Sequence, residues 1–390
     1  MSDDNGSIKL VVTENKGRAL VSSRPLKAGE VILRDSPILS YLAAPLGAVA
    51  ASSSSAATAN YCSHCFRTIS PNSPPAVACP NCSNSSIFCS PQCQSASLST
   101  SHTPFVCQTL IRLGAADSPL AGHHHSRHIL ARFLISAYNL AIVSPSNFQT
   151  LLSLQGEPSF DETSMFLHSV ISPFCNSPIL GQFGFSVELT AALLAKDKVN
   201  AFGLMEPFTQ DKARSVRAYG IYPKAAFFNH DCLPNACRFD YVDSVNDFSN
   251  TDIVVRVLHD IPAGREICLS YFPVNLKYSE RQKILREDYG FTCDCDRCKA
   301  EIKWSDDEEE EEDEMDGDDD NGMDEDDVGP MDNDEEDEED DDFPHQYFFL
   351  RYMCSRDGCG GTLAPLQPSN GQPSSIMECH VCGSFSNCEE

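Results

Sequence analysis

A short stretch near the middle of the chain concentrates side chains that can do chemistry. Within nine residues it holds an imidazole, a carboxylate, a thiol and two amides, in the order Phe227-Phe228-Asn229-His230-Asp231-Cys232-Leu233-Pro234-Asn235. Pro234 fixes its own φ and favours an extended residue before it, so we expect a bent loop anchored by the apolar residues that precede it. Taken alone, this pattern fits a buried turn as well as it fits a functional site.

Eight possible metal ligands lie nearer the N-terminus in paired spacings: Cys62 with Cys65, Cys79 with Cys82, Cys89 with Cys93, and His102 with Cys107. Two thiolates that are two or three residues apart can share one tetrahedral zinc ion, so eight ligands predict two closed structural sites. The stretch is rich in Pro, Ser and Asn and could barely bury itself without metal. We therefore favour zinc over unliganded core cysteines.

Two further cysteine groups follow. Cys293, Cys295 and Cys298 offer three thiolates, whereas a structural zinc site needs four, and Cys232 and Cys237 compete for the remaining position. A small zinc ribbon is predicted near the C-terminus, with Cys354, Cys359, Cys379 and Cys382 as ligands. His380 lies between two of these cysteines and is not expected to bind the ion. The sequence therefore predicts about four zinc ions.

Four more segments accompany the central loop: Lys16–Leu20, Val199–Gly203, Gly264–Tyr271 and Tyr289–Cys298. In this order the five segments resemble the SET domain of protein-lysine methyltransferases, and specifically its SET-and-MYND (SMYD-like) branch. The motifs Asn-His-Asp-Cys-x-Pro-Asn and Tyr-x-Phe-x-Cys-x-Cys-x-x-Cys carry most of the specificity. The resemblance covers the chain outside an acidic run and the last segment.

The resemblance implies how the metal ligands are grouped. In a MYND finger the two sites interleave, with Cys62, Cys65, Cys89 and Cys93 on one ion and Cys79, Cys82, His102 and Cys107 on the other. The fourth ligand of the post-SET tail would be Cys232, which would tie that tail to the central loop. The tryptophan that is usual before the histidine is absent here, which bears on a peptide groove rather than on the metal sites.

The resemblance also implies a cofactor and the roles of single residues. The residues that would hold S-adenosylmethionine are Lys16, Arg18, Asn200, Asn229, His230, Tyr289 and Phe291. Among them, Phe291 would pack against the adenine of the cofactor. Tyr271 would orient the lysine amine, and Tyr289 would form the opposite wall of the lysine channel. Two positions depart from the family pattern, namely Ala19 in place of a glycine and Arg265 in place of an acidic residue.

Methyl transfer to lysine requires little acid–base machinery. The protein must align the reacting atoms and deliver a neutral amine, whose usual pKa is about 10.4. Desolvation next to a cation favours loss of that proton. The main alternative is a catalytically weak scaffold that regulates transcription through protein contacts, and a nucleic-acid-binding protein is disfavoured because no basic patch with interleaved aromatic residues is present.

The fold class expected is α+β, with a β-rich SET domain split by a MYND finger and a helical insert. Strands are predicted within residues 8–41, at 253–258 and at 266–271, and helices at 129–143, 162–171 and 189–199. We expect Ser279 to cap a helix that runs through 283–285. The histidines at 123–125 and His128 are expected on a solvated approach to a helix.

Seven segments are predicted from composition and motifs. They are the N-terminal SET part with an Ala/Ser linker at 1–60, the finger at 61–107, the helical insert at 108–198, the SET core at 199–272, the post-SET tail at 273–304, an acidic run at 305–342, and the ribbon at 343–390. The acidic run holds 27 Asp and Glu residues and no Lys or Arg, and without them the net charge of −29 would be −2. We expect this run to be disordered.

The remaining composition bounds partners and location. No apolar run is long enough to span a bilayer and no secretory leader is recognised, so the 19 cysteines indicate a reducing compartment, the nucleus or the cytoplasm. We expect a monomer that binds a lysine-bearing protein or peptide, histones included, with protein partners for the finger and no direct contact to nucleic acid or membrane. The substrate lysine and the degree of methylation leave no signature in the sequence.

Overall fold

The structure is a computed structural model of the chain. It describes residues 6–13, 17–47, 60–70, 75–82, 86–175, 181–209, 215–243, 250–303, 345–369 and 371–387. Lys16, residues 48–59 of the predicted Ala/Ser linker, the acidic run and Cys388 lie outside the described residues.

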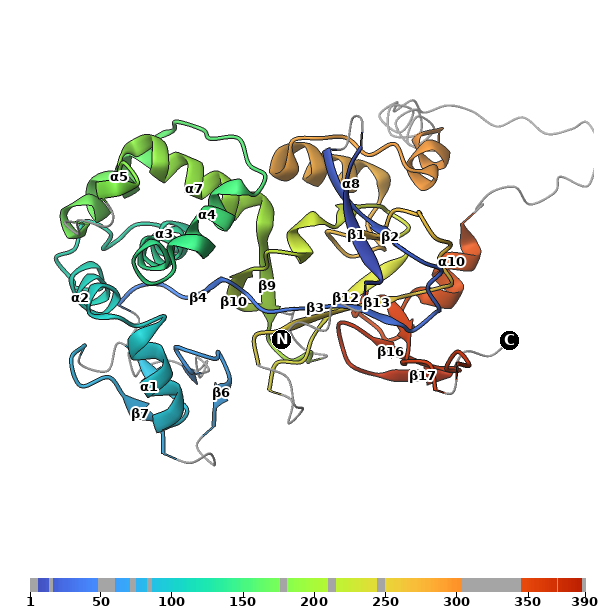
Figure 1. Cartoon of the computed structure of the whole chain (residues 1–390), viewed down its shortest axis with the longest axis horizontal. Helices are drawn as coiled ribbons and strands as arrows, with labels where there is room; N and C mark the ends of the chain where they lie inside the picture. The colour runs from blue at the N-terminus through green and yellow to red at the C-terminus, as the bar shows by residue number, and fades with distance from the viewer. Residues whose placement is uncertain are drawn as a thin grey trace, which may run out of the picture.

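Short sheets gathered around one central region form the middle of the molecule (Figure 1). One hairpin comes from the N-terminal segment alone: β1 (Ile8–Thr13) pairs with β2 (Gly17–Ser22). The other sheets combine N-terminal strands with strands from beyond residue 200: β3 (Val31–Asp35) with β13 (Ile253–Val257) and β12 (Ala236–Asp240), and β4 (Leu39–Leu42) with β10 (Val216–Ile221) and β9 (Ala201–Met205). The two halves of the chain are therefore one folding unit.

Strand β13 shows why these segments become strands. Its sequence Ile-Val-Val-Arg-Val is β-branched at four of five positions, and all five residues are buried. It is paired along both edges, with β12 and β3, and it is buried on both faces, which is where a continuous apolar run is expected. Its side chains share a core with Leu20, Tyr222 and Phe228, which anchors the central loop.

A helical block occupies one side of the molecule (Figure 1). It consists of α2 (Pro104–Leu113), α3 (His125–Val143), α4 (Pro145–Ser153), α5 (Glu162–Ile171), η1 (Ser172–Phe174) and α7 (Val187–Asn200). Helix α3 lies at its centre, and Phe133, Leu134 and Tyr138 are fully buried there. Helix α7 ends at Asn200 and runs directly into β9, so the block positions the Val199–Gly203 motif.

Two small units without a large core complete the fold. The finger contains β5 (Asn60–Tyr61), β6 (Thr68–Ile69), β7 (Val77–Ala78), β8 (Ile87–Phe88) and α1 (Pro91–Ser99). The ribbon follows α10 (Gln346–Tyr352) and is the sheet β15 (Leu363–Pro365), β16 (Ile376–Cys379) and β17 (Phe385–Asn387). In Figure 1 the ribbon packs below β12 and β13.

The remaining elements surround the central loop: η2 (Ala225–Phe227), β11 (Asn229–His230), β14 (Cys268–Leu269), α8 (Tyr278–Ile284) and η3 (Leu285–Tyr289). None of the helices in the described ranges is both long and apolar enough to cross a membrane.

Two local expectations were wrong. Helix α8 begins at Tyr278 with Lys277 as its N-cap, because the Glu280 carboxylate accepts a hydrogen bond from the Lys277 backbone N–H at 3.1 Å. Ser279 therefore lies in the first turn and is not the cap. His128 is buried in α3 rather than solvated, since the helix already starts at His125.

Candidate active site

The central loop is fastened to the strand that precedes Tyr271. Strand β11 pairs in parallel with β14, so that Asn229 lies opposite Cys268 and His230 opposite Leu269. Asn235 closes the loop, because its Nδ2 donates to the Glu266 carbonyl at 2.8 Å and its Oδ1 accepts from the Cys268 N–H at 2.9 Å. Sequence reasoning gave Asn235 no role, although its place in the motif was a signal. Its amide joins the central loop to the segment that precedes Tyr271.

The buried His230 connects this loop to Tyr271. Burial lowers the pKa of His230 to about 4, so the imidazole is neutral at physiological pH. Its Nδ1 accepts a hydrogen bond from the Tyr271 backbone N–H at 3.2 Å. The ring proton therefore resides on Nε2, which lies 3.3 Å from the Cys232 sulfur and can donate to it. One imidazole thus links the strand of Tyr271 to a cysteine cluster.

Two tyrosines face each other beside the loop. The Tyr271 hydroxyl donates to the Phe228 carbonyl at 2.9 Å, and the ring centroids of Tyr271 and Tyr289 are 4.7 Å apart. Burial raises the pKa of both phenols, so both stay protonated over the physiological range. Since the Tyr271 proton is already donated, the lone pairs of its oxygen remain available to accept a hydrogen bond from an amine.

The residues predicted to hold a cofactor are arranged around Asn229. The Asn229 Nδ2 donates to the Arg18 carbonyl at 3.3 Å and to Glu266 Oε1 at 2.8 Å, so Oδ1 is the atom the amide can offer to a ligand. The Asn200 Nδ2 is also used internally, on the carbonyls of Gln155 and Lys196. The amides are therefore held in fixed orientations.

Aromatic contacts place two more of the predicted residues. The Arg18 guanidinium carbon lies 4.7 Å from the ring centroid of Phe227. Phe291 is 40% exposed, and its ring centroid lies 6.5 Å from those of His230 and Tyr289. An exposed aromatic ring next to the site offers a surface on which a flat base can pack.

A cavity of about 730 Å³ contains the tyrosine pair. Its lining includes Asn200, Phe202, Phe228, Tyr271 and Tyr289. The motif segments around residues 200, 228, 271 and 289 therefore meet at one hollow, although they are separated along the chain by helices and loops.

The sixteen predicted metal ligands form four groups of four. They are Cys62, Cys65, Cys89 and Cys93; Cys79, Cys82, His102 and Cys107; Cys232, Cys293, Cys295 and Cys298; and Cys354, Cys359, Cys379 and Cys382, with the ligand atoms of each group within 4.8 Å of one another. Cys232 and not Cys237 joins the third group. Cys237 and His380 lie outside all four.

The distances suit zinc. A tetrahedral ion with Zn–S bonds of about 2.3 Å holds sulfurs about 3.8 Å apart. The measured separations are 3.7 Å for Cys65 and Cys89, 3.5 Å for Cys232 and Cys298, and 3.8 Å for Cys354 and Cys382. Burial lowers the pKa of His102, whose Nε2 faces Cys82 at 3.6 Å, so its ring is the neutral form that a metal needs.

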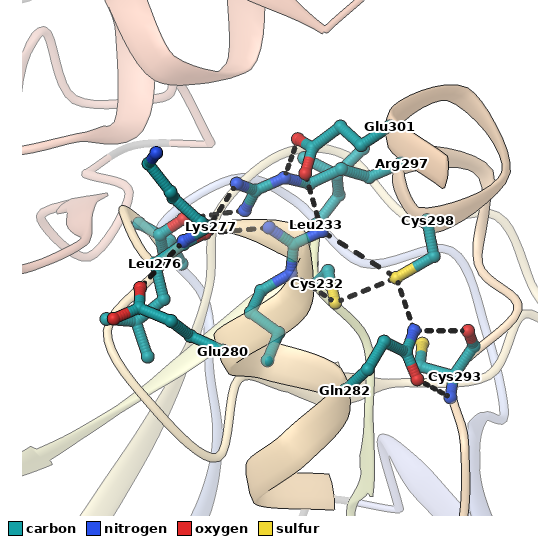
Figure 2. Close-up of polar contacts among 12 residues, drawn as sticks. Cys232, Leu233, Leu276, Lys277, Glu280, Gln282, Cys293, Arg297, Cys298 and Glu301 are labelled. Atoms are coloured by element: carbon teal, nitrogen blue, oxygen red, sulfur yellow. Dashed lines mark hydrogen bonds and ion pairs between the residues drawn. The ribbon is translucent and has the colours of Figure 1, made fainter. Parts of the chain in front are cut away.

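Donors surround the third group of cysteines (Figure 2). The Arg281 Nε lies 3.3 Å from the Cys232 sulfur, and Gln282 Nε2 lies 3.3 Å from the Cys298 sulfur. Arg281 is fully buried and also donates to Glu301 Oε2 at 2.7 Å. Four thiolates on one Zn²⁺ carry a net charge of −2, and a buried guanidinium offsets part of it. Sequence reasoning missed Arg281 and Gln282.

The SET domain profile matches residues 17–272, about two thirds of the chain. The chain belongs to the SET-domain family. The SET protein named Histone-lysine N-methyltransferase ASHR2, from Arabidopsis thaliana, is 49% identical over all of this chain and 99% of its own length. Histone-lysine N-methyltransferase SMYD3 from Homo sapiens is 33% identical over 22% of this chain and 18% of its own.

The SET match covers most of the motifs and shows which segments belong to the SET domain. It begins at β2, includes the finger and the helical block, and ends one residue after Tyr271. In this chain the SET fold is thus built from two separated halves, which the sheets β4–β10–β9 and β12–β13–β3 join. Tyr289, Phe291 and the last three cysteines of the third group lie beyond the match, and the cluster with Cys232 fastens them to the SET core.

Proposed function

We propose that this SET-domain protein is a lysine methyltransferase that uses S-adenosylmethionine to methylate the ε-amine of a protein lysine. The observation that supports it best is the tyrosine pair, in which the Tyr271 hydroxyl is fixed 2.9 Å from the Phe228 carbonyl and faces Tyr289 across 4.7 Å. Whole-length similarity to a plant histone-lysine methyltransferase agrees with it.

The cofactor is assigned to the side of the loop that carries Asn229. Arg18, Asn229 and the His230 backbone are its proposed polar contacts, with Asn200 in support and Phe291 against the adenine. The Asn229 Oδ1 fits an amino group, because both hydrogens of the same amide are already donated to Arg18 and Glu266. Lys16 completes the predicted set but lies outside the described residues.

When bound, S-adenosylmethionine supplies a methyl group on a cationic sulfur that is a good leaving group. The protein must therefore hold the lysine amine in line and in its neutral form. The Tyr271 oxygen accepts one N–H of the amine, which leaves the nitrogen lone pair aligned with the methyl group. The rings of Tyr271, Tyr289 and Phe228 exclude water from the channel, and this desolvation favours the uncharged amine.

The cysteine groups are assigned to zinc, one ion to each. The first two groups make the segment at 61–107 a MYND-type finger, and the third makes the segment at 273–304 a post-SET tail that holds Tyr289 and Phe291 over the site. The substrate is a lysine in a protein, and histones are one candidate. A nuclear or cytoplasmic location follows from that substrate class.

One experiment tests the function directly. The purified chain is incubated with S-adenosylmethionine labelled on its methyl group and with a mixed protein extract, and the labelled residue is identified by mass spectrometry. We expect label on lysine side chains. Label on another residue type, or no cofactor binding by calorimetry, would contradict the proposal.

A further inference from the structure

The ribbon forms one wall of the cavity that holds the tyrosine pair. Six ribbon residues, none of them a residue of the SET match, line it: Gly358, Cys359, Gly360, Thr362, His380 and Val381. They face residues of β9 and β12, among them Phe202 and Arg238. A lysine side chain that reaches Tyr271 would bring the neighbouring residues of its peptide between the ribbon and these strands.

A buried ion pair holds this wall in place. Arg256 Nη2 of β13 lies 2.8 Å from Glu378 Oε2 of β16, and the Arg256 Nη1 donates to the Pro365 carbonyl at 3.3 Å. The guanidinium carbon also lies 4.1 Å from the centroid of the Phe239 ring. Because Arg256 and Glu378 are both buried, the wall has a defined position relative to β12.

Arg238 contributes charge to the lining. Arg238 is the one residue with a permanent charge among the described residues that line the cavity, and none of these residues is Asp or Glu. Its Nη1 donates to the Gly203 carbonyl at 2.9 Å and its guanidinium carbon lies 5.5 Å from the Phe202 ring centroid. No ion pair joins this half-buried arginine to a carboxylate within the described part of the chain.

A guanidinium has five N–H donors in a rigid fork that matches a carboxylate. The bond to Gly203 fixes one end of the Arg238 fork and leaves other donors for a ligand. Partial burial makes an unpaired charge costly, and a carboxylate from outside would offset that cost. A substrate with further lysines next to the target lysine would be repelled by the positive charge of Arg238.

We infer that Arg238 binds a carboxylate of the substrate close to the target lysine, so that the enzyme selects lysines with Asp or Glu neighbours. This inference rests on the proposed function and names its substrate class. Arg238 then acts as a specificity residue: it touches the flanking residue of the substrate, while Tyr271 contacts the amine.

The test measures which lysines become labelled in a pool of peptides. A protein extract is digested with a protease that does not cleave at lysine, so that the peptides keep their lysines and flanking residues. The peptide pool is then incubated with labelled S-adenosylmethionine and one of three enzymes: the wild type, Arg238→Glu, or the control Arg112→Glu. Arg112 is an exposed residue of α2 outside the cavity lining. Mass spectrometry then counts acidic and basic residues within three positions of each methylated lysine, relative to all lysines of the pool.

We expect the wild type and Arg112→Glu to favour acidic neighbours about tenfold over basic ones, as one charged hydrogen bond would give. Arg238→Glu should reverse the preference. If Arg238 only tied β12 to β9, the variant would lose activity equally on all peptides, and that result would overturn the inference. Labelled peptides without any charge preference would overturn it too, while leaving the proposed function intact. No labelling at all would overturn both.

Discussion

The hydroxyl of Tyr271 donates a hydrogen bond to the backbone carbonyl of Phe228 at 2.9 Å. Phe228 directly precedes Asn229, the residue with which the cofactor contacts are proposed to begin. The position of the tyrosine oxygen is therefore coupled to the loop on the cofactor side. Because the proton is committed to a carbonyl, the oxygen faces a substrate as an acceptor, which suits a neutral amine.

Tyr271→Phe should lower turnover by about 10²-fold while S-adenosylmethionine binding stays within a factor of two or three. The substitution keeps the ring that faces Tyr289 and removes only the oxygen. Calorimetry for the cofactor and a labelled-methyl assay for turnover measure the two effects separately. Full activity in this variant would show that Tyr271 is not the residue that orients the amine, with Tyr289→Phe as the next variant to examine.

Asn229→Ala should act in the opposite order and weaken cofactor binding about tenfold. The change removes the Oδ1 acceptor and also the bonds to Arg18 and Glu266, so the thermal midpoint must be measured alongside. Ser7→Ala, at a buried hydroxyl that bonds Arg24 instead, is a control for the loss of one polar group. Unchanged cofactor affinity in Asn229→Ala would place the cofactor elsewhere.

Four zinc ions per chain are expected by elemental analysis of freshly purified protein. Cys232→Ser should remove one ion and weaken cofactor binding together, because the third group of cysteines ties Phe291 and Tyr289 to the SET core. Cys237→Ser is the matched control, since Cys237 is a buried thiol outside the four groups. Two or fewer ions in the wild type, or loss of an ion in the control, would refute this assignment.

Gln282→Leu should lower the zinc affinity of the third site by about tenfold or more, as loss of a hydrogen bond to a metal ligand commonly does. The leucine fills similar volume but cannot donate to the Cys298 sulfur. Chelator titration followed by elemental analysis gives the order in which ions are lost. Lys283→Leu, at the exposed neighbouring position of α8, should behave as the wild type. Equal retention of all ions in both variants would argue against a role for Gln282.

Breaking the ion pair that holds the ribbon should be costly. Arg256→Met alone leaves the Glu378 carboxylate buried without its cation and should reduce the free energy of unfolding by about 3–5 kcal/mol. The double variant Arg256→Met, Glu378→Leu should recover much of that loss, because two apolar side chains replace two buried charges. Denaturant unfolding of both variants measures the difference. A double variant as unstable as the single one would mean that Arg256 acts mainly through Phe239 and Pro365.

The sequence by itself determined the family and the pairing of neighbouring metal ligands, while the resemblance to a MYND finger and a post-SET tail implied which pairs share an ion. Spacings such as Cys62-x2-Cys65 are local, and a local pattern restricts which atoms can share an ion before any tertiary contact exists. The motifs around Asn229, Tyr271 and Tyr289 are also local, so the tyrosine pair and its loop could be anticipated together with the strands and helices of strong periodicity.

Only the tertiary structure decided how the distant parts meet. The Tyr271 bond to Phe228, the Asn235 bridge and the contacts of Arg281 with Cys232 join segments 31 to 49 residues apart along the chain. No spacing predicts such contacts, because they depend on which strands pair and which helix ends nearby. The positions of Arg238 and of the ribbon also depend on tertiary packing. Arg238 is a charged residue within a strand, and it acquires its proposed role because packing leaves it half buried in a cavity whose described lining residues include no carboxylate.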